Sequence, residues 1–273
     1  MGRTTGLRRR AIIAESGLPL RPRDPGPSGP STGALLTVLA ANLYRTERGA
    51  EAQARAVLAV DADLLLLTEV SADTVDALGA AGLATSHPHA VLDPDEGYFG
   101  AAIASRHPLT DRGGRDLGGR RGRVADVHVG GTDVRVVPVH TQAPIHDHDV
   151  AVWHSTIEAN AAVADEAPGP VVLAGDWNAT GGHRRLRRAL SRRGLVDAQV
   201  RRGHRWFPTW PTAAHPLMWV PLTPVLTLDH VVVSADVAVV GLERLPLPAT
   251  DHLALRAALR LPAAPVRPAG RGR

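Results

Sequence analysis

The stretch PVVLAGDWN at residues 170–178 is the part of the sequence that decides the fold prediction. An apolar run leads directly into Asp176 and Asn178, which is typical of a buried strand that stops at a polar edge. In the segment HRRLRRALSRRG at 183–194, Leu186, Ala189 and Leu190 recur at helical spacing. We therefore predict a strand over 170–178 followed by a helix over 183–193.

The same arrangement, an apolar run that meets polar residues, recurs along the chain. A single asparagine or aspartate at a strand end is usually a turn residue or a helix cap. Strands that share a sheet, however, bring their ends to a common edge, which is where open α/β sheets usually bind ligands. The repeated pattern predicts a functional edge formed by Asn42, Glu69, His140, Asp176, Asn178, Asp229, His230, Asp251 and His252.

Short runs of strand type alternate with amphipathic stretches of helix type. Strands outnumber helices, and Gly130-Gly131 joins two strands as a hairpin, which together indicate mixed sheets with helices packed outside. We find no repeat of fixed period and no long linker inside 34–262, so one domain is expected there. The predicted strands are 34–43, 63–70, 98–108, 123–131, 132–141, 170–178, 227–235 and 252–260, and the predicted helices are 49–60, 72–81, 150–166 and 183–193.

Composition excludes several classes of protein. The 273 residues are 44% apolar, as in globular domains and unlike disordered chains. Because the chain has no cysteine, it can form no disulfide framework, thiolate metal site or cysteine nucleophile. The chain has no lysine, so arginine supplies all of its strongly basic side chains. Six arginines lie in 1–30 and three in 266–273, so the body between them, residues 31–265, carries a small excess of acidic residues. A uniformly basic, DNA-coating body is therefore not expected.

Both ends of the chain lack a periodic apolar pattern. The segment PRDPGPSGPSTG at 22–33 is rich in proline, glycine and serine, so we expect a disordered leader at 1–33 and a disordered tail at 263–273. No apolar run reaches the length of about 18 residues that a membrane span needs. We expect a cytoplasmic monomer, because Glu15 and Gly17 interrupt the signal-like stretch at 8–14. Secretion is left open, because a chain without cysteine is compatible with any redox compartment.

The chemistry of the predicted edge follows from its residue types. Carboxylates, amides and imidazoles without a thiol suit a hard divalent cation, most naturally Mg²⁺ with Mn²⁺ as a substitute. Such an ion beside Asp-His and Asp-x-Asn pairs suits hydrolysis of a phosphoester, in which a carboxylate or histidine deprotonates water and amide and imidazole donors hold phosphate oxygens.

These segments, taken in order, resemble the endonuclease/exonuclease/phosphatase superfamily over roughly residues 34 to 260. The resemblance rests on Asn42, LLLLTEV with Glu69, VVPVHT with His140, LAGDWN at 173–178, TLDHVVVS at 227–234 and ATDHLAL at 249–255. It implies the deoxyribonuclease I-like fold, a four-layer α/β sandwich in which two mixed sheets pack face to face with helices outside.

The resemblance also implies a role for each edge residue. Glu69 would be the principal metal ligand, supported by Asn42 and Asp251. Asp176 and Asn178 would orient water and the scissile phosphate, and His140 would donate to a phosphate oxygen. His252 would act on the phosphate or as general base, oriented by Asp229; whether Asp176 or His252 takes the proton of the water stays open. Tyr44 stands where certain DNA-repair relatives carry a further acidic ligand.

Other features bear on the substrate. The helix 183–193 carries Arg187 and Arg188, which are expected to bind a phosphate-rich substrate, possible nucleic acid included; a solvated helix face is the simpler alternative. The glycine-rich segment 112–123 is expected to be a flexible loop. Trp206, Trp210 and Trp219 are expected in the core rather than against a base or lipid. His146-Asp147-His148 is a weak candidate for a second metal site.

The alternative function is a catalytically silent family member that binds a phosphorylated ligand or a protein partner.

Overall fold

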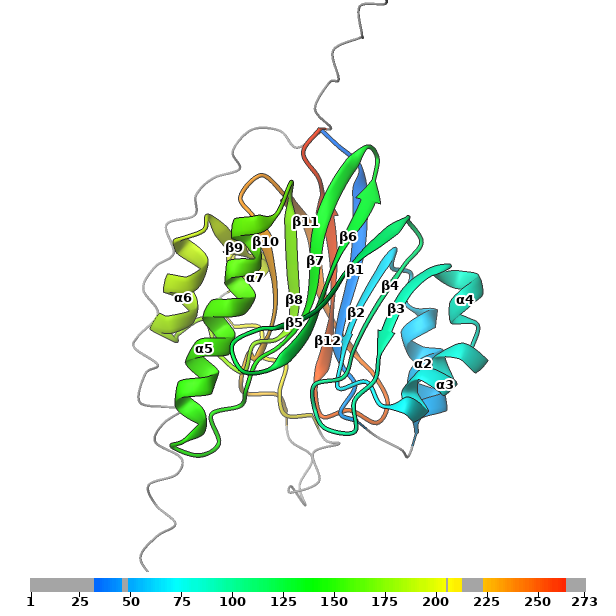
Figure 1. Ribbon diagram of the computed structural model, residues 1–273, viewed down its shortest axis with the longest axis horizontal. Coiled ribbons are helices and arrows are strands. Elements are labelled where there is room, and N and C mark those ends of the chain that lie inside the picture. The colour runs from blue at the N-terminus through cyan, green and yellow to red at the C-terminus, as the bar shows by residue number, and fades with distance from the viewer. Residues whose placement is uncertain (1–31, 46–48, 205, 213–222, 264–273) are drawn as a thin grey trace, which may run out of the picture.

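The computed structural model describes residues 32–45, 49–204, 206–212 and 223–263. Apart from residues 32, 33 and 263, the predicted leader 1–33 and tail 263–273 lie outside the described residues, as does Trp219. The described part folds into two mixed β-sheets, each of six strands, that pack face to face (Figure 1). The predicted four-layer sandwich is thus confirmed.

The first sheet has the strand order β11-β12-β1-β2-β4-β3. Its central neighbours β1 and β2 run parallel, and every other neighbouring pair is antiparallel. The strands are β1 (Leu35–Asn42), β2 (Leu64–Thr68), β3 (His89–Asp93), β4 (Ala101–Ser105), β11 (Ala238–Pro246) and β12 (Leu253–Arg260).

The second sheet has the strand order β5-β6-β7-β8-β10-β9. Here β7 and β8 run parallel and the remaining pairs are antiparallel, the β6–β7 pair being the predicted hairpin. The strands are β5 (Leu109–Asp116), β6 (Arg121–Val129), β7 (Thr132–His140), β8 (Val171–Asp176), β9 (Leu195–Asp197) and β10 (Asp229–Ser234).

Helices cover the outer face of each sheet (Figure 1). Beside the first sheet lie α2 (Ala50–Ala59), α3 (Ala72–Ala80) and α4 (Leu83–Ser86); beside the second lie α5 (Asp149–Ala162), which continues into the 3₁₀ turn η1 (Val163–Glu166), and α6 (Arg184–Ser191). A short helix, α7 (Ala198–Arg201), follows β9. None of the helices in these described ranges is long and apolar enough to cross a membrane.

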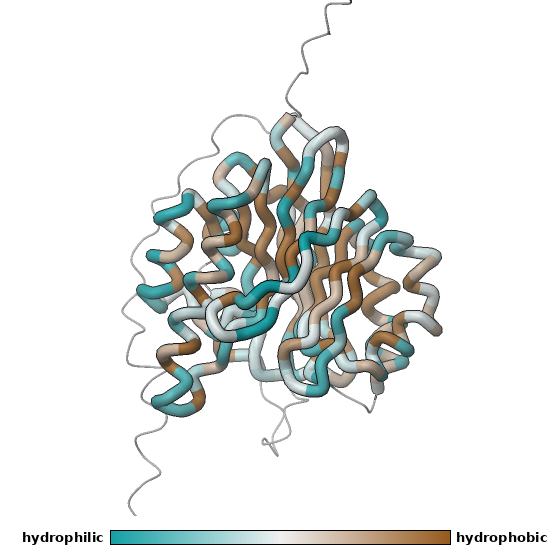
Figure 2. Tube along the Cα trace, viewed as in Figure 1, coloured by the Kyte–Doolittle hydropathy of each residue, from teal (hydrophilic) through white to brown (hydrophobic). Residues whose placement is uncertain are grey.

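The run LLLLT of β2 shows how the sequence builds these layers. Side chains alternate along a strand, so Leu64 and Leu66 face the second sheet while Leu65 and Leu67 face α2 and α3. All four are fully buried because both faces of the strand are covered. Figure 2 shows the same pattern, with hydrophobic strands inside and hydrophilic residues on the outer helices. Burial on both faces explains why the central strands appear in the sequence as continuous apolar runs.

The strands absent from the sequence prediction are the outermost ones of each sheet: β3, β5, β9 and β11. These edge strands are short or partly exposed, and β5 reads LTDRGGRD, without an apolar run. An edge strand pairs on one side only and commonly carries charged residues and bulges, so its sequence resembles a loop.

The prediction of a flexible loop at 112–123 is wrong. Residues 112–116 belong to β5 and residues 121–123 to β6, and Gly114 pairs with Arg123 beyond a bulge. Two arginines of this hairpin bind distant carboxylates: Arg112 Nε lies 2.7 Å from Asp126 Oδ2 and Arg115 Nη1 lies 2.6 Å from Glu166 Oε2. Ion pairs and ladder hydrogen bonds therefore order a segment whose glycines suggested flexibility.

Candidate active site

The strand register brings the predicted polar residues to one edge of the sandwich. In the second sheet His140 of β7 pairs with Asp176 of β8, and Asp176 pairs with Asp229 of β10. In the first sheet Asn42, the last residue of β1, pairs with Thr68, so Glu69 follows directly. Gly175 makes the close pairing of β7 and β8 possible, since a Cβ there would lie 2.3 Å from the carbonyl oxygen of Val139.

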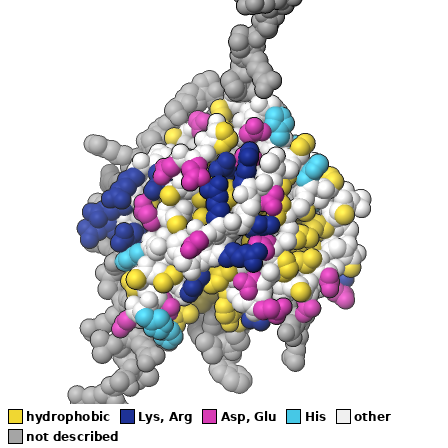
Figure 3. Space-filling view, in the orientation of Figure 1, with side chains coloured by type: hydrophobic (Ala, Val, Ile, Leu, Met, Phe, Trp, Pro, Cys, Tyr) yellow, Lys and Arg dark blue, Asp and Glu magenta, His cyan; other side chains and the backbone are white. Residues whose placement is uncertain are grey.

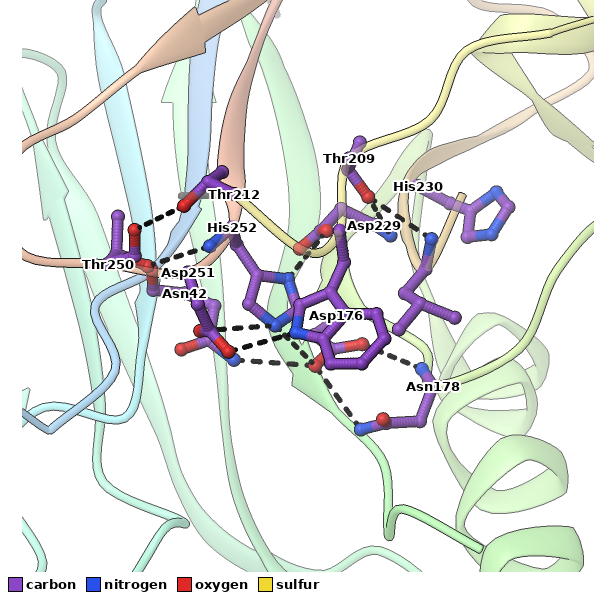
Figure 4. Close-up of polar contacts among 12 residues, drawn as sticks. Asn42, Asp176, Asn178, Thr209, Thr212, Asp229, His230, Thr250, Asp251 and His252 are labelled. Atoms are coloured by element: carbon purple, nitrogen blue, oxygen red, sulfur yellow. Dashed lines mark hydrogen bonds and ion pairs between the residues drawn. The ribbon is translucent and has the colours of Figure 1, made fainter. Parts of the chain in front are cut away.

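Asp176 lies at the centre of the polar contacts (Figure 4). Its Oδ1 accepts a hydrogen bond from the backbone N–H of Asn178 at 2.8 Å, and its Oδ2 accepts from the Asn178 side chain at 3.2 Å and from Asn42 Nδ2 at 3.3 Å. Because Asn42 belongs to the first sheet, its amide joins the two sheets. Burial raises the pKa of the Asp176 carboxyl to about 6, against the opposing effect of His252.

His252 lies between carboxylates on both sides of its ring. Nδ1 donates to Asp229 Oδ2 at 2.8 Å, and Nε2 lies 3.7 Å from Asp176 Oδ2. Burial lowers the pKa of the imidazole, but Asp229 and Asp176 together outweigh burial and raise this pKa to about 10. A neutral ring would direct a lone pair at a carboxylate, so the geometry favours the doubly protonated imidazolium.

His140 is oriented by a main-chain group. Nδ1 donates to the carbonyl oxygen of Tyr98 at 2.7 Å, and the ring stacks on Phe99 with centroids 5.2 Å apart. These contacts direct Nε2 toward Glu69 Oε1 at 3.7 Å and Asp176 Oδ2 at 3.8 Å. The second nitrogen of His140 is thus available to a ligand bound between these carboxylates.

Glu69 has an unusual backbone and an unsatisfied oxygen. Its φ is 55°, in the left-handed region that a side chain with a Cβ rarely adopts. Oε1 accepts a hydrogen bond from Asn42 Nδ2 at 2.9 Å, whereas the buried Oε2 has no hydrogen-bond partner among the described residues. A strained backbone and a buried carboxylate oxygen without a partner are both typical of functional sites.

Asp251 lies beside Glu69 and Asn42. Its Oδ2 accepts a hydrogen bond from the indole N–H of Trp210 at 2.9 Å, and its Oδ1 lies 3.9 Å from His252 Nε2. Burial, followed by Asp251 and Glu69, raises the pKa of the Tyr44 phenol, which therefore stays protonated. Tyr44 also orients Asn42, because its backbone N–H donates to Asn42 Oδ1 at 2.9 Å.

The structure brings together all of the predicted catalytic and metal-side residues, which we call the Asp176 cluster: Asn42, Glu69, His140, Asp176, Asn178, Asp229, Asp251 and His252. His230 lies outside it and is turned away (Figure 4), with Nδ1 2.7 Å from Asp197 Oδ2 and Nε2 2.7 Å from the carbonyl oxygen of Ala179. Arg187 and Arg188 lie on α6, and Arg187 donates to the carbonyl of Gly181.

Sequence reasoning missed the loop groups that orient the cluster. Trp210 was expected in the core, but its N–H binds Asp251, and Trp206 is 68% exposed. The orienting carbonyl of Tyr98 carries no side-chain signal at all. Thr250 fixes the neighbouring strand ends, since its hydroxyl donates to the carbonyl of Asn42 at 2.8 Å. Unlike the contacts of Trp210 and Tyr98, the Thr250 hydroxyl is visible in the sequence as a donor that directly precedes the Asp251-His252 pair.

The Asp176 cluster offers carboxylate and amide oxygens, the donor type that a hard divalent cation such as Mg²⁺ takes. In the described ranges no group of three or more His, Asp or Glu side chains is arranged to enclose a metal, at the Asp176 cluster or at His146-Asp147-His148. Mg²⁺ usually keeps several waters and uses only one or two protein carboxylates. The unpartnered Glu69 Oε2, beside Asn42 and Asp251, matches that requirement.

The chain combines a two-sheet sandwich with a cluster of carboxylates and imidazoles at one edge. Comparison with known proteins identifies the family to which a chain of this kind belongs. A family model described as Endonuclease/Exonuclease/phosphatase family matches residues 39–252. The chain belongs to this family, as the sequence resemblance predicted. Its members are hydrolases that act on phosphoester bonds. No curated protein matches the chain with significance.

Solved structures share the fold at low sequence identity. D. rerio TDP2 complexed with a single-strand DNA product is 16% identical, with a TM-score of 0.64 over 83% of this chain and 99% of that one. Beta toxin from Staphylococcus aureus is 16% identical, with a TM-score of 0.57 over 81% and 99%. An endonuclease/exonuclease/phosphatase from Beutenbergia cavernae is 21% identical, with a TM-score of 0.61 over 85% and 73%. These likenesses establish the fold.

Proposed function

We propose that the chain is a Mg²⁺-dependent phosphoesterase that hydrolyses a phosphodiester or phosphomonoester bond by attack of water on the phosphorus. The observation that carries the proposal is the convergence on Asp176. Side chains from three other segments lie within 3.3–3.8 Å of Asp176 Oδ2: Asn42 from the first sheet, His140 from β7 and His252 before β12. Family membership supports the same reaction class.

Glu69 would hold the metal, with Asn42 and Asp251 beside it. The carboxylate oxygen that lacks a protein partner is the natural ligand, since a buried charge of this kind needs a counterion. When bound, Mg²⁺ would stabilise negative charge on the phosphate oxygens, and Mn²⁺ could replace it.

The remaining residues of the Asp176 cluster would accept the proton of the water and donate hydrogen bonds to the phosphate oxygens. Asp176, fixed by three hydrogen bonds from Asn178 and Asn42, would orient the attacking water and accept its proton. His252, held as an imidazolium by Asp229, would donate to a phosphate oxygen rather than act as the base. His140 would donate to a second oxygen through Nε2 when that nitrogen is protonated. Geometry thus favours Asp176 in the choice that the sequence left open.

Hydrolysis assays test the proposal directly. The wild-type protein should hydrolyse at least one of bis(p-nitrophenyl) phosphate, p-nitrophenyl phosphate, an oligonucleotide, sphingomyelin or a phosphoinositide with Mg²⁺, and EDTA should abolish the activity. Asp176→Asn should lower kcat by on the order of a hundred- to ten-thousandfold, the range for loss of a general base. Asp76→Asn, which removes an exposed carboxylate on α3, is the matched control and should retain full activity.

Absence of hydrolysis on the whole panel with either metal would sink the proposal and favour the silent, ligand-binding alternative. If Asp176→Asn instead retained wild-type activity while the folded fraction stayed unchanged, the protein would be an enzyme but Asp176 would not be its general base.

A further inference from the structure

The helix α6 presents arginines that the rest of the protein does not neutralise. Arg184, Arg185 and Arg188, here called the α6 arginines, are exposed, and within the described ranges no carboxylate forms an ion pair with them. Arg193, just beyond the helix, is different: it lies 2.9 Å from Glu158 Oε1 and 3.0 Å from Asp165 Oδ2. Figure 3 shows basic side chains gathered over the α6 region at the left edge of the molecule.

The charge in the first turn of α6 runs against helix energetics, although Arg188 lies in the last turn, where a basic residue is favoured. The positive end of a helix dipole favours acidic residues in the first turn, and α2, α3 and α5 carry Glu51, Asp73 and Asp149 there. The first turn of α6 has no acidic residue and begins with Arg184 and Arg185. Arg184 and Arg188 also repel each other at the i, i+4 spacing. A local rule broken without compensation is expected where a ligand supplies the missing charge.

The strand register shows that α6 begins at the end of the sandwich that carries the Asp176 cluster. Asp176 ends β8 and pairs with Asp229 at the start of β10, whereas Leu195 begins β9 and pairs with Ser234 at the far end of β10. The chain between Asp176 and Leu195 must therefore run from the cluster end to the opposite end. The first turn of α6, with Arg184 and Arg185, lies nearer the cluster, and Arg188 lies one turn farther away.

The chemistry of this surface favours a phosphate chain over a membrane. The planar guanidinium group binds phosphate with two hydrogen bonds. Residues four apart on a helix lie about 5–6 Å from each other, so Arg184 and Arg188 are spaced to bind neighbouring phosphates. A helix that enters a membrane surface needs exposed apolar side chains, but Leu186, Ala189 and Leu190 of α6 are all buried. The acidic excess of the body makes the positive charge local.

We infer that the α6 arginines form a docking surface for the phosphate backbone of a nucleic acid whose scissile phosphate lies at the Asp176 cluster. The inference rests on the proposed phosphoesterase activity and specifies its substrate class. Arg187 contributes less, because its Nη1 donates to the carbonyls of Gly181 and Gly182. Arg188, by contrast, keeps the substrate-binding role that the sequence suggested.

Binding measured without catalysis tests this inference separately from the activity. Fluorescence anisotropy with a labelled single-stranded oligonucleotide, in EDTA and over a NaCl series, should show salt-dependent binding by the 273-residue chain. The variant R184Q/R185Q/R188Q should bind at least about tenfold more weakly, and its slope of log affinity against log salt should be smaller by about 2–3. The single charge reversal R188E should weaken binding in the same direction.

The control variant R55Q/R115Q/R256Q removes the same charge from arginines paired with Glu51, Glu166 and Glu243. An equal loss of affinity in this control, or no binding by the wild type, would overturn the inference. Equally tight, α6-dependent binding to phosphatidylserine vesicles would assign the surface to a lipid instead. If the wild type cleaves bis(p-nitrophenyl) phosphate without binding DNA, only the inferred docking surface is refuted. If α6-dependent binding occurs without any hydrolysis, only the proposed reaction is refuted.

Discussion

The two ends of strand β2 use their carboxylates in opposite ways. At the start of the strand, Asp63 Oδ2 accepts hydrogen bonds from the backbone N–H and the hydroxyl of Thr37, at 2.8 and 2.6 Å. About 20 Å away at the other end, Glu69 has a left-handed backbone and an oxygen without a hydrogen-bond partner in the described ranges. The carboxylate at one end accepts hydrogen bonds from Thr37, whereas the carboxylate at the other end keeps a buried oxygen without a hydrogen-bond partner in the described ranges.

The contrast separates a carboxylate that stabilises the fold from one for which we propose a function. Burial raises the pKa of Asp63, but the hydrogen bonds from Thr37 outweigh burial and hold that pKa below its usual value. The ionised carboxylate is therefore stabilised by folding. Glu69 has no comparable set of donors, and the cation that we propose it binds would supply the missing countercharge. Mutations at the two ends should accordingly affect different measurements.

The largest expected effect is the loss of activity in Glu69→Gln. The amide keeps the size of the side chain and removes the charge, so kcat should fall on the order of a hundred- to thousandfold. The melting temperature without metal should stay level or rise, because an unpaired buried charge disappears. Differential scanning fluorimetry should also show that Mg²⁺ raises the melting temperature of the wild type but not of this variant. A Glu69→Gln protein that kept the wild-type kcat and the Mg²⁺-induced rise in melting temperature would contradict the functional role proposed for Glu69.

The second effect is on stability, at the opposite end. Asp63→Ala removes the acceptor of two hydrogen bonds and leaves the N–H of Thr37 without a partner, so the free energy of unfolding should fall by about 2 kcal/mol. Urea denaturation measures the loss, and kcat should remain unchanged. Asp61→Ala is the matched control, because the Asp61 side chain is exposed and, among the described residues, forms its ion pair with Arg106, which also lies 3.4 Å from Asp63 Oδ1; its effect should stay within about 0.5 kcal/mol. Equal losses in the two variants would contradict the structural role of Asp63.

The smallest effect concerns pH and His87, which lies near Asp63. This side chain is buried, its Nε2 donates to the carbonyl of Ala62 at 3.1 Å, and burial lowers its pKa. The folded pKa is below the unfolded value of about 6.5, so the stabilising contribution is complete above that value and is lost as pH falls through 6.5 toward the folded pKa. Urea titrations at several pH values should show this decline in the wild type and a flatter profile in His87→Gln. The exposed variant His148→Gln should keep the wild-type profile; an unchanged profile in His87→Gln would refute the assignment.

The sequence predicted the central strands and missed the edge strands for one physical reason. A strand such as β8 is covered on both faces, so its apolar run and its abrupt polar end are visible in the sequence. The edge strand β5 is half solvated and ordered by ion pairs such as Arg115 with Glu166, which lie far apart in the sequence. Pairing partners of this kind are not encoded in any local pattern.

The candidate site follows the same division. Asp176, Asp229 and Asp251 could be predicted because each lies where an apolar strand begins or ends. The groups that orient the site could not, since the carbonyl of Tyr98 has no side-chain signature and Trp210 reaches Asp251 from a loop. Nor does sequence indicate the left-handed φ of Glu69. Strand ends are local properties of a sequence, whereas loop contacts depend on the completed fold.

The hydrogen bonds of Asn42 depend on how the two sheets are aligned. Its single amide nitrogen binds Glu69 beside its own sheet and Asp176 across the sandwich, at 2.9 and 3.3 Å. A small slip of one sheet over the other would break the longer contact while every strand stayed paired. Altered packing deep between the sheets, for example at Leu66 or Val231, would therefore reach the reactive edge as a misalignment, and catalytic rate would report it before spectroscopic signs of unfolding appeared.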